Sequence, residues 1–161
     1  MILDAILQAA LDPAPLPEPT VVAAGVVAGE REPRPDRAQV SRIVEAASIV
    51  PARWRPFARC LVARESHGNP QARNPHSSAQ GIAQWLDRSW RYGLAHRVAV
   101  RLHEHGMTWP AALAVRDWLR GKEIATWPEA YQWIGLASSL DDGNWTPWRL
   151  AGSSCNGLVA S

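Results

Sequence analysis

The sequence predicts a mostly α-helical domain over residues 37–150, preceded by a Pro-rich extension over residues 1–36 and followed by a tail over residues 151–161. Apolar residues recur three and four positions apart in several segments after residue 37, which is the spacing of one helix face. Six of the thirteen prolines fall within the first 38 residues, a density typical of an extended spacer. With 161 residues, 47% of them hydrophobic, the chain can form one domain with a substantial core.

The extension differs from the rest of the chain in charge. Residues 1–38 carry six acids and three arginines, whereas residues 39–161 carry nine acids and fourteen basic residues. We interpret the extension as a flexible linker, with a docking segment as the alternative. Its start, Met1-Ile-Leu-Asp4, lacks the positive residues that open a secretory signal, and no run of 18 or more apolar residues could span a membrane.

A first helix is predicted from Asp36, as N-cap, to the residue before Pro51. The next is predicted from Pro56 to Gly68, because proline suits a first turn and glycine follows helix ends. Three more helices are predicted. The first runs from Trp90 to Gly106, with Leu94, Val98 and Leu102 on its buried face, and the second from Thr108 to Gly121. The third runs from a capping box formed by Thr126 and Glu129 to Leu140, and its buried side is expected to carry Ala130, Trp133, Ile134, Ala137 and Leu140.

The helix over residues 56–68 carries an acid in an unusual place. Phe57, Leu61 and Glu65 are four residues apart and therefore lie along one helix face. Glu65 is thus in line with residues that face the core, and it lies near the negative end of the helix dipole. Both settings disfavour the ionised carboxylate, so we predict that the pKa of Glu65 is raised. An acid that stays protonated near neutral pH can donate its proton to a leaving group.

The alternative for Glu65 is a solvated residue paired with Arg64 or Arg59, which is the commoner setting for such a glutamate. The sequence that follows favours the functional interpretation. It reads Glu65-Ser66-x-x-Asn69-Pro70-x-Ala72-x-Asn74 and then Ala79-x-Gly81-Ile82-x-Gln84. Over residues 57–90 this order and spacing resembles the lysozyme-like superfamily, in particular soluble lytic transglycosylases, goose-type lysozymes, resuscitation-promoting factors and actinobacteriophage lysins.

The resemblance implies a lysozyme-like helical fold with at most a small β-hairpin, which would lie in the polar segment over residues 69–80. It also implies cleavage of the β-1,4 bond between MurNAc and GlcNAc in peptidoglycan, with Glu65 as the catalytic acid. Ser66 would support the acid, and Gly81, Gln84 and Trp85 would contact the sugar, with Gly81 letting the backbone approach it. Of the nine tryptophans, we expect most in the core and one or two in a carbohydrate cleft.

Lytic transglycosylases carry Ala-Tyr-Asn in a later helix, and the nearest counterpart here is Ala130-Tyr131-Gln132, without the asparagine. Tyr131 is therefore either a cleft hydroxyl or a core aromatic. In relatives the region of Cys60 is often joined to a C-terminal cysteine by a disulfide. Cys60 and Cys155 could form such a bond, and two free thiols remain the alternative.

Glycosidases normally use two carboxylates, but no acid here, Asp87 included, falls where the resemblance demands a second one. This favours a lytic transglycosylase, in which one glutamate acts as acid and then as base, over a hydrolytic lysozyme. A non-catalytic protein that docks on peptidoglycan or a virion is a further alternative. We expect no cofactor and no metal, since alternate residues in His103-Glu104-His105 point away from each other on a helix.

The expected partners are the glycan strands of peptidoglycan and, through residues 1–36, virion or tail proteins. The basic helical part would be attracted to an anionic polymer. Nucleic acid is not expected as a partner, because no basic run is interleaved with aromatic residues. The expected place of action is the cell wall, outside the cell or as part of a virion.

Overall fold

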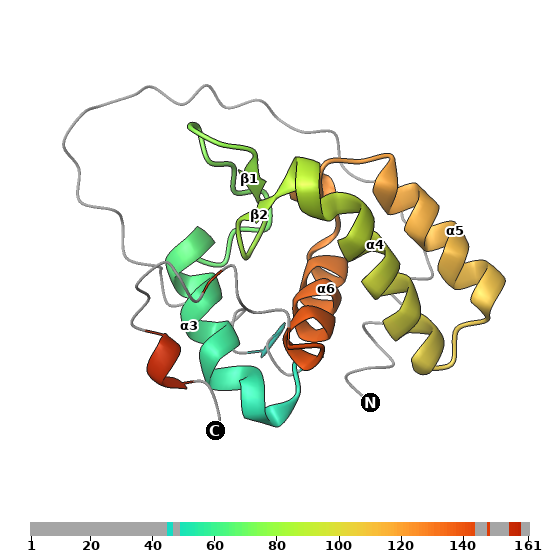
Figure 1. The fold of residues 1–161 in the computed structure, drawn as a ribbon, viewed down its shortest axis with the longest axis horizontal. Helices are drawn as coiled ribbons and strands as arrows, with labels where there is room; N and C mark the ends of the chain where they lie inside the picture. The colour runs from blue at the N-terminus through green and yellow to red at the C-terminus, as the bar shows by residue number, and fades with distance from the viewer. Residues whose placement is uncertain (1–44, 47–48, 144–147, 149–154, 159–161) are drawn as a thin grey trace.

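The structure is a computed structural model that describes residues 45–46, 49–143, 148 and 155–158 (Figure 1). The Pro-rich extension and most of the helix predicted before Pro51 lie outside the described residues. The elements are the α-helices α3 (Arg55–Ser66), α4 (Asp87–Glu104), α5 (Trp109–Arg120) and α6 (Glu129–Asp141), the strands β1 (Ala79–Gln80) and β2 (Trp85–Leu86), and the 3-10 helices η2 (Ala52–Trp54), η3 (Ile124–Thr126) and η4 (Asn156–Leu158). The prediction of a mostly α-helical domain is confirmed for this part of the chain.

The strands form one antiparallel hairpin, in which Ala79 pairs with Leu86 and Gln80 with Trp85. Arg73 adds an isolated bridge to Gln80, so the polar segment before β1 folds back onto the hairpin. The hairpin lies between the end of α3 and the start of α4 (Figure 1). None of the helices in the described part of the chain is both long and apolar enough to cross a membrane.

Helix α6 is the centre of the domain. Its residues from Tyr131 to Leu140 are all buried, and it lies between α3 and α4 in the view of Figure 1. The sequence predicted that only one side of this helix is buried, but the structure buries all of its sides. Ala130, which was predicted to be buried, is only half-buried. Helix α4 comes so close that a Cβ atom on Gly135 would lie 2.9 Å from Leu94 Cδ1. A side chain at this position would therefore push the two helices apart.

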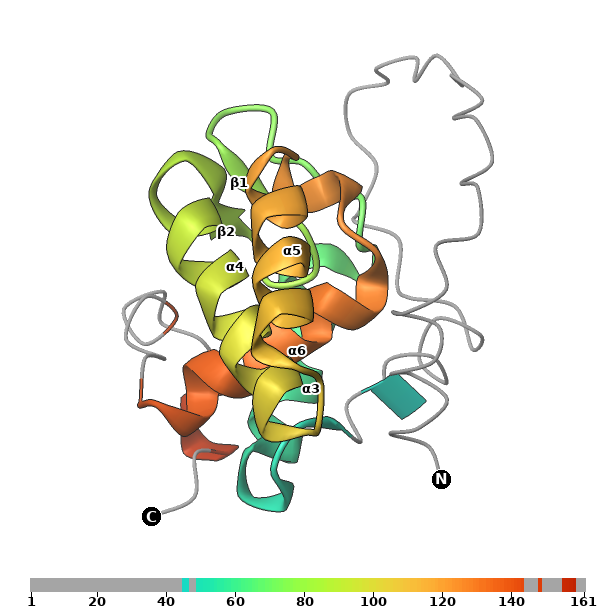
Figure 2. The same cartoon turned by 90° about the vertical axis from the view of Figure 1, so that its right-hand side faces the viewer.

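Helices α4 and α5 pack side by side (Figures 1 and 2). The predicted face of α4 is confirmed, because Leu94, Val98 and Leu102 are all buried. Helix α4 ends just before Gly106, whose φ of 101° is a conformation that glycine adopts readily. The chain then reverses and α5 begins at Trp109, close to its predicted start.

The predicted capping box at the start of α6 is wrong. The hydroxyl of Thr126 donates to the carbonyl of Glu123 at 2.7 Å, inside the turn of η3. Pro128 precedes the helix, and the carboxylate of Glu129 accepts a hydrogen bond from Trp133 Nε1 at 3.2 Å. The spacing of threonine and glutamate fitted the motif, but the two residues belong to different helices.

Cys60 and Cys155 form a disulfide across 95 residues of sequence, with their Cα atoms 5.7 Å apart. Cys60 lies on α3 and Cys155 immediately precedes η4, so the bond attaches η4 to the side of α3 (Figure 1). Of the two alternatives that the sequence left open, the structure shows the joined form.

Reduction of this disulfide is expected to lower the free energy of unfolding by roughly 2–4 kcal/mol, because the bond restricts a long loop in the unfolded chain. Urea unfolding with and without dithiothreitol measures the difference. The double variant Cys60→Ser/Cys155→Ser should match the reduced protein and be insensitive to the reductant. Alkylation of both thiols in denatured, unreduced protein would show that the bond is not formed.

Candidate active site

Glu65 lies in the last turn of α3, as predicted. Leu61 and Phe57, one and two turns earlier on the same face, are fully buried, and Glu65 is half-buried at the edge of the core. The helix ends one residue later, where His67 adopts a left-handed conformation with φ of 53° and donates its backbone N–H to the carbonyl of Val62. Glu65 therefore lies at the junction between α3 and the loop that follows it.

Burial raises the pKa of Glu65 above its ordinary value of 4.5, and the nearby guanidinium of Arg64 opposes the shift. The direction agrees with the prediction, and desolvation is its main cause. Within the described part of the chain, the Glu65 carboxyl accepts no hydrogen bond and forms no ion pair. A half-buried carboxyl without such partners has little to hold it in the ionised form.

The other acids of the described ranges differ from Glu65. Glu45 is exposed. The remaining acids each have a basic or N–H partner: Asp87 with Arg91, Glu104 with Arg101, Asp117 with Arg116, Glu123 with Arg73, Glu129 with Trp133, Asp141 with Arg53, and Asp142 with Arg97. Glu65 is thus the one half-buried acid in the described ranges that is kept unpaired.

The raised pKa of Glu65 predicts the pH dependence of stability. The folded state holds this proton more tightly than the unfolded state, so the ionised carboxylate destabilises the fold above the raised pKa. As the pH falls through the folded pKa toward 4.5, that penalty is lost. Glu65→Gln is therefore expected to melt at a higher temperature than the parent protein at pH 7 and at the same temperature near pH 4. Equal melting temperatures at both values of pH would contradict the shift.

Ser66 joins the end of α3 to the turn of the hairpin. Its buried hydroxyl lies 2.8 Å from the carbonyl oxygen of Ile82 and 3.2 Å from that of Val62. The first contact fixes the turn over residues 81–84 against the residue next to the acid. Ser66 therefore positions Glu65, and its buried hydroxyl is not open to a substrate.

Gly81 is required by the local packing of the turn. Its φ is +79°, and a Cβ atom here would lie 2.4 Å from Gln132 Oε1. The glycine is therefore needed for the close packing of the turn against α6, and its contact with a sugar stays a prediction. Gln84 also has a positive φ, of 51°, and its side-chain amide donates to the Gly81 carbonyl at 3.1 Å. Gln84 is half-buried, which leaves part of its side chain accessible to a ligand.

The structure places Trp85 and Tyr131 in the core. Trp85 is only 2% exposed, and its ring packs edge-on against Trp148 with centroids 6.2 Å apart. It has no free face on which a sugar could stack, so we assign it no sugar contact.

Tyr131 is buried, which raises the pKa of its phenol, and its ring packs against that of Trp118. Of the two interpretations of Tyr131, the structure favours the core aromatic.

Gln132 is the residue of this region whose role the sequence did not indicate. It is 0% exposed, and its Oε1 accepts the backbone N–H of Ile82 at 2.9 Å. Its Nε2 lies 2.9–3.1 Å from the carbonyl oxygens of Pro70, Ile124 and Trp127. One amide thus joins the loop after α3, the hairpin turn and the segment before α6. A glutamine within a helix of mostly apolar residues was the available signal.

Asp87 cannot act as a second catalytic carboxylate in this structure. It is 3% exposed and forms an ion pair with Arg91. Its Oδ1 also accepts the backbone N–H of Ile124 at 2.9 Å. These contacts hold the start of α4 against η3 and leave the carboxylate no route to a substrate.

A surface groove of about 610 Å³ lies at the other end of α4 and α6 from the hairpin. Three arginines line it, and each is paired with an acid: Arg53 and Arg101 with Asp141, and Arg97 with Asp142. None of the predicted site residues contributes to its walls. Because each arginine that lines the groove is paired with an acid, the groove presents no unpaired arginine to an anion.

Family models, curated proteins and solved structures were compared with the chain, and no match was found in any of the three. The candidate site is therefore defined by its own residues. Its parts are the unpaired acid at the end of α3, the turn fixed beside it by Ser66, and the buried amide of Gln132 behind that turn.

Proposed function

We propose that this chain cleaves the β-1,4 bond between MurNAc and GlcNAc in peptidoglycan, with Glu65 as the acid. The observation that carries the proposal is that Glu65 alone among the described acids is half-buried, unpaired and raised in pKa. Keeping a carboxyl in this state destabilises a fold, and such groups are concentrated at sites of proton transfer. The resemblance of residues 57–90 to lysozyme-like enzymes supplies the substrate class.

In the proposed reaction the protonated carboxyl of Glu65 donates its proton to the glycosidic oxygen as the bond from that oxygen to C1 of MurNAc breaks. The carboxylate formed in this step then removes the proton from the C6 hydroxyl of the same MurNAc. The C6 oxygen bonds to C1, which gives a 1,6-anhydro sugar and returns Glu65 to its protonated form. No water is consumed, and one carboxyl serves as acid and then as base.

The surroundings of Glu65 support a single-acid mechanism. A hydrolytic enzyme normally needs a second carboxylate about 5–10 Å away from the first, as nucleophile or as base for water. Asp87, the first acid after Glu65 in the sequence, is occupied by Arg91 and by the backbone of Ile124. The half-buried amide of Gln84, on the turn beside the acid, is the group we assign to contact the sugar.

The disulfide between Cys60 and Cys155 supports action outside the cell, because such bonds persist in oxidising surroundings. We propose the cell wall as the place of action, reached alone or as part of a virion. Residues 1–36 would then carry the docking function toward virion or tail proteins.

Mass spectrometry of the products from purified peptidoglycan tests the proposal. Muropeptides that end in 1,6-anhydro-MurNAc are expected, each lighter by one water than the hydrolysed product. Reducing MurNAc ends alone would show a hydrolytic lysozyme instead. Binding to peptidoglycan without any new chain ends, in solution and in a zymogram, would identify a non-catalytic wall-binding protein.

A further inference from the structure

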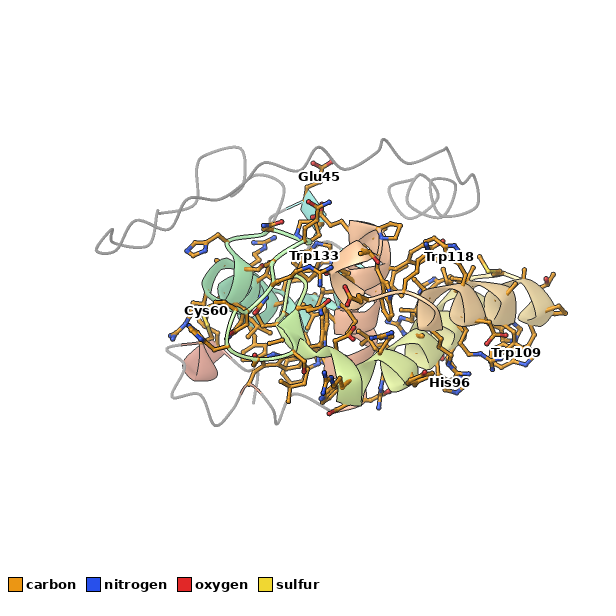
Figure 3. All side chains as sticks on the ribbon, turned by 90° about the horizontal axis from the view of Figure 1, so that it is seen from above. Glu45, Cys60, His96, Trp109, Trp118 and Trp133 are labelled. Atoms are coloured by element: carbon orange, nitrogen blue, oxygen red, sulfur yellow. A yellow bond between two sulfur atoms is a disulfide. The ribbon has the colours of Figure 1, made fainter. Side chains whose placement is uncertain are left out.

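Two tryptophans in the described part of the chain are substantially exposed, and both lie on α5 (Figure 3). Trp109 begins the helix and packs against the ring of His103. Trp118, near the end of the helix and closer to α6, is 43% exposed. A partly exposed indole presents an apolar ring face at the surface, so Trp118 is a candidate binding surface.

A cation accompanies Trp118. The ammonium of Lys122 lies 5.0 Å from the centroid of the Trp118 ring. Within the described residues Lys122 forms no ion pair. It is also the only lysine in a chain whose other basic residues are arginines. An aromatic surface beside an unpaired positive charge matches a ligand that has an apolar ring face next to a carboxylate.

Buried hydrogen bonds connect this surface to Glu65. Trp127 Nε1 donates to the carbonyl oxygens of Leu119 and Lys122, at 3.0 and 3.2 Å, and so fixes the end of α5. The carbonyl of Trp127 accepts from Gln132, whose Oε1 accepts from the N–H of Ile82. The carbonyl of Ile82 accepts in turn from Ser66, beside Glu65. The two regions are thus held in one rigid frame.

Tyr131 completes the connection from the other side. Its ring packs at an interplanar angle of 60° against Trp118, with centroids 6.2 Å apart. Tyr131 is buried and precedes Gln132 in α6, so the orientation of the Trp118 ring is set by the same helix that holds the hairpin turn. A ring fixed in advance loses little conformational entropy when a ligand stacks on it.

We propose that Trp118 and Lys122 form an outer subsite for a carboxylate-bearing sugar of the glycan strand that Glu65 cleaves, an inference that rests on the proposed function. The sugar ring stacks on the exposed part of Trp118, and its carboxylate pairs with Lys122. The carboxylate is that of the lactyl group of MurNAc or of the stem peptide attached to it. The subsite selects peptidoglycan over neutral polymers of GlcNAc.

The single lysine allows a direct test on the full chain. Reductive methylation with ¹³C-formaldehyde labels Lys122 and the terminal amine while keeping both charges. Substitution of the lysine shows which of the two NMR signals belongs to Lys122. Loss of one signal in Lys122→Arg assigns it. The probes, added to the Glu65→Gln variant, are chitin oligosaccharides, peptide-free peptidoglycan strands, peptide-bearing strands and isolated stem peptide.

The Lys122 signal is expected to shift with carboxylate-bearing strands and to stay in place with chitin oligosaccharides. A shift with peptide-free strands identifies the lactyl carboxylate, and a shift only with peptide-bearing strands identifies the stem peptide. Equal shifts with neutral chitin oligosaccharides, or a shift with isolated stem peptide alone, would overturn the subsite. Absence of any shift would overturn it as well.

Substitutions give an independent measurement. Trp118→Ala is expected to weaken binding of peptidoglycan strands about tenfold. Lys122→Gln should weaken it about two- to fivefold, while Lys122→Arg restores it and chitin binding is unchanged. Trp109→Ala, which removes the other exposed tryptophan of α5, is the matched control and should bind normally. Unchanged binding in Trp118→Ala and Lys122→Gln would overturn the proposal.

The outcomes separate this subsite from the proposed function. If the parent protein cleaves peptidoglycan but Trp118→Ala and Lys122→Gln behave like it, the subsite is wrong and the cleavage stands. If the parent protein does not cleave but the Lys122 signal still responds to carboxylate-bearing strands, the subsite stands on a non-catalytic wall-binding protein. If neither cleavage nor a response is seen, both proposals fail.

Discussion

Glu65→Gln is expected to lower the rate of peptidoglycan cleavage by roughly 10²–10⁴-fold, the range typical of a lost general acid. Glutamine keeps the shape of the side chain but has no carboxyl proton to donate. Because the Glu65 carboxyl accepts no hydrogen bond and forms no ion pair within the described residues, the change should leave the fold intact. Release of soluble muropeptides over time measures the rate, and circular dichroism checks the fold.

Glu65→Asp should also lose most of the activity, since it withdraws the carboxyl by one methylene and misplaces the donor. The matched control is Glu104→Gln, which makes the same change at an exposed position on α4 and should cleave normally. Asp87→Asn should retain activity per folded molecule, although its loss of charge next to Arg91 is expected to reduce stability. Near-full activity in Glu65→Gln together with an inactive Asp87→Asn would mean that the wrong acid has been assigned.

Gln132→Leu is expected to destabilise the domain by roughly 3–5 kcal/mol, because several buried backbone groups lose their partner at once. These are the N–H of Ile82 and the carbonyls of Pro70, Ile124 and Trp127. Leucine is close in size, so the loss would come from unsatisfied polar groups rather than from a cavity. Urea unfolding measures it.

Ser139→Ala is the control for Gln132→Leu. Ser139 is buried on the same helix, and among the described residues its hydroxyl bonds only the carbonyl of Gly135, at 2.8 Å. Its loss should cost about 0.5–1.5 kcal/mol. If Gln132→Leu fails to fold, Gln132→Asn should still give a folded but weakened domain, because it retains the amide. A change below about 1 kcal/mol in Gln132→Leu would show that the amide does not hold these segments together.

The helices could be predicted from the sequence because their limits are marked locally. Pro56 and Pro110 lie in first turns, and Gly106 has a positive φ just after α4. Apolar spacing also predicted the buried face of α4. It could not show that α6 is buried on all sides, since serines and a glutamine occur among its apolar residues and only the packing of the folded core, with α4 against α6, reveals their burial.

The site was predicted in part. The position of Glu65 and the direction of its pKa shift follow from helical spacing alone. The roles of Gly81 and Trp85 did not, because they depend on contacts with Gln132 and Trp148, which are 51 and 63 residues away in the sequence. Trp118 and Lys122 were not singled out, because exposure of one tryptophan among nine is a property of the folded surface.

The central position of α6 has a consequence for synthesis. The ribosome makes α3, α4 and α5 before α6, although α6 supplies the surface against which the core closes. Until α6 emerges, the nascent chain must expose apolar faces of α3 and α4 that the finished domain covers. Such an intermediate is prone to aggregate and to be bound by chaperones. Completion of the core therefore depends on α6, and ribosomes that stall before residue 129 would hold a chain without the helix against which the core closes.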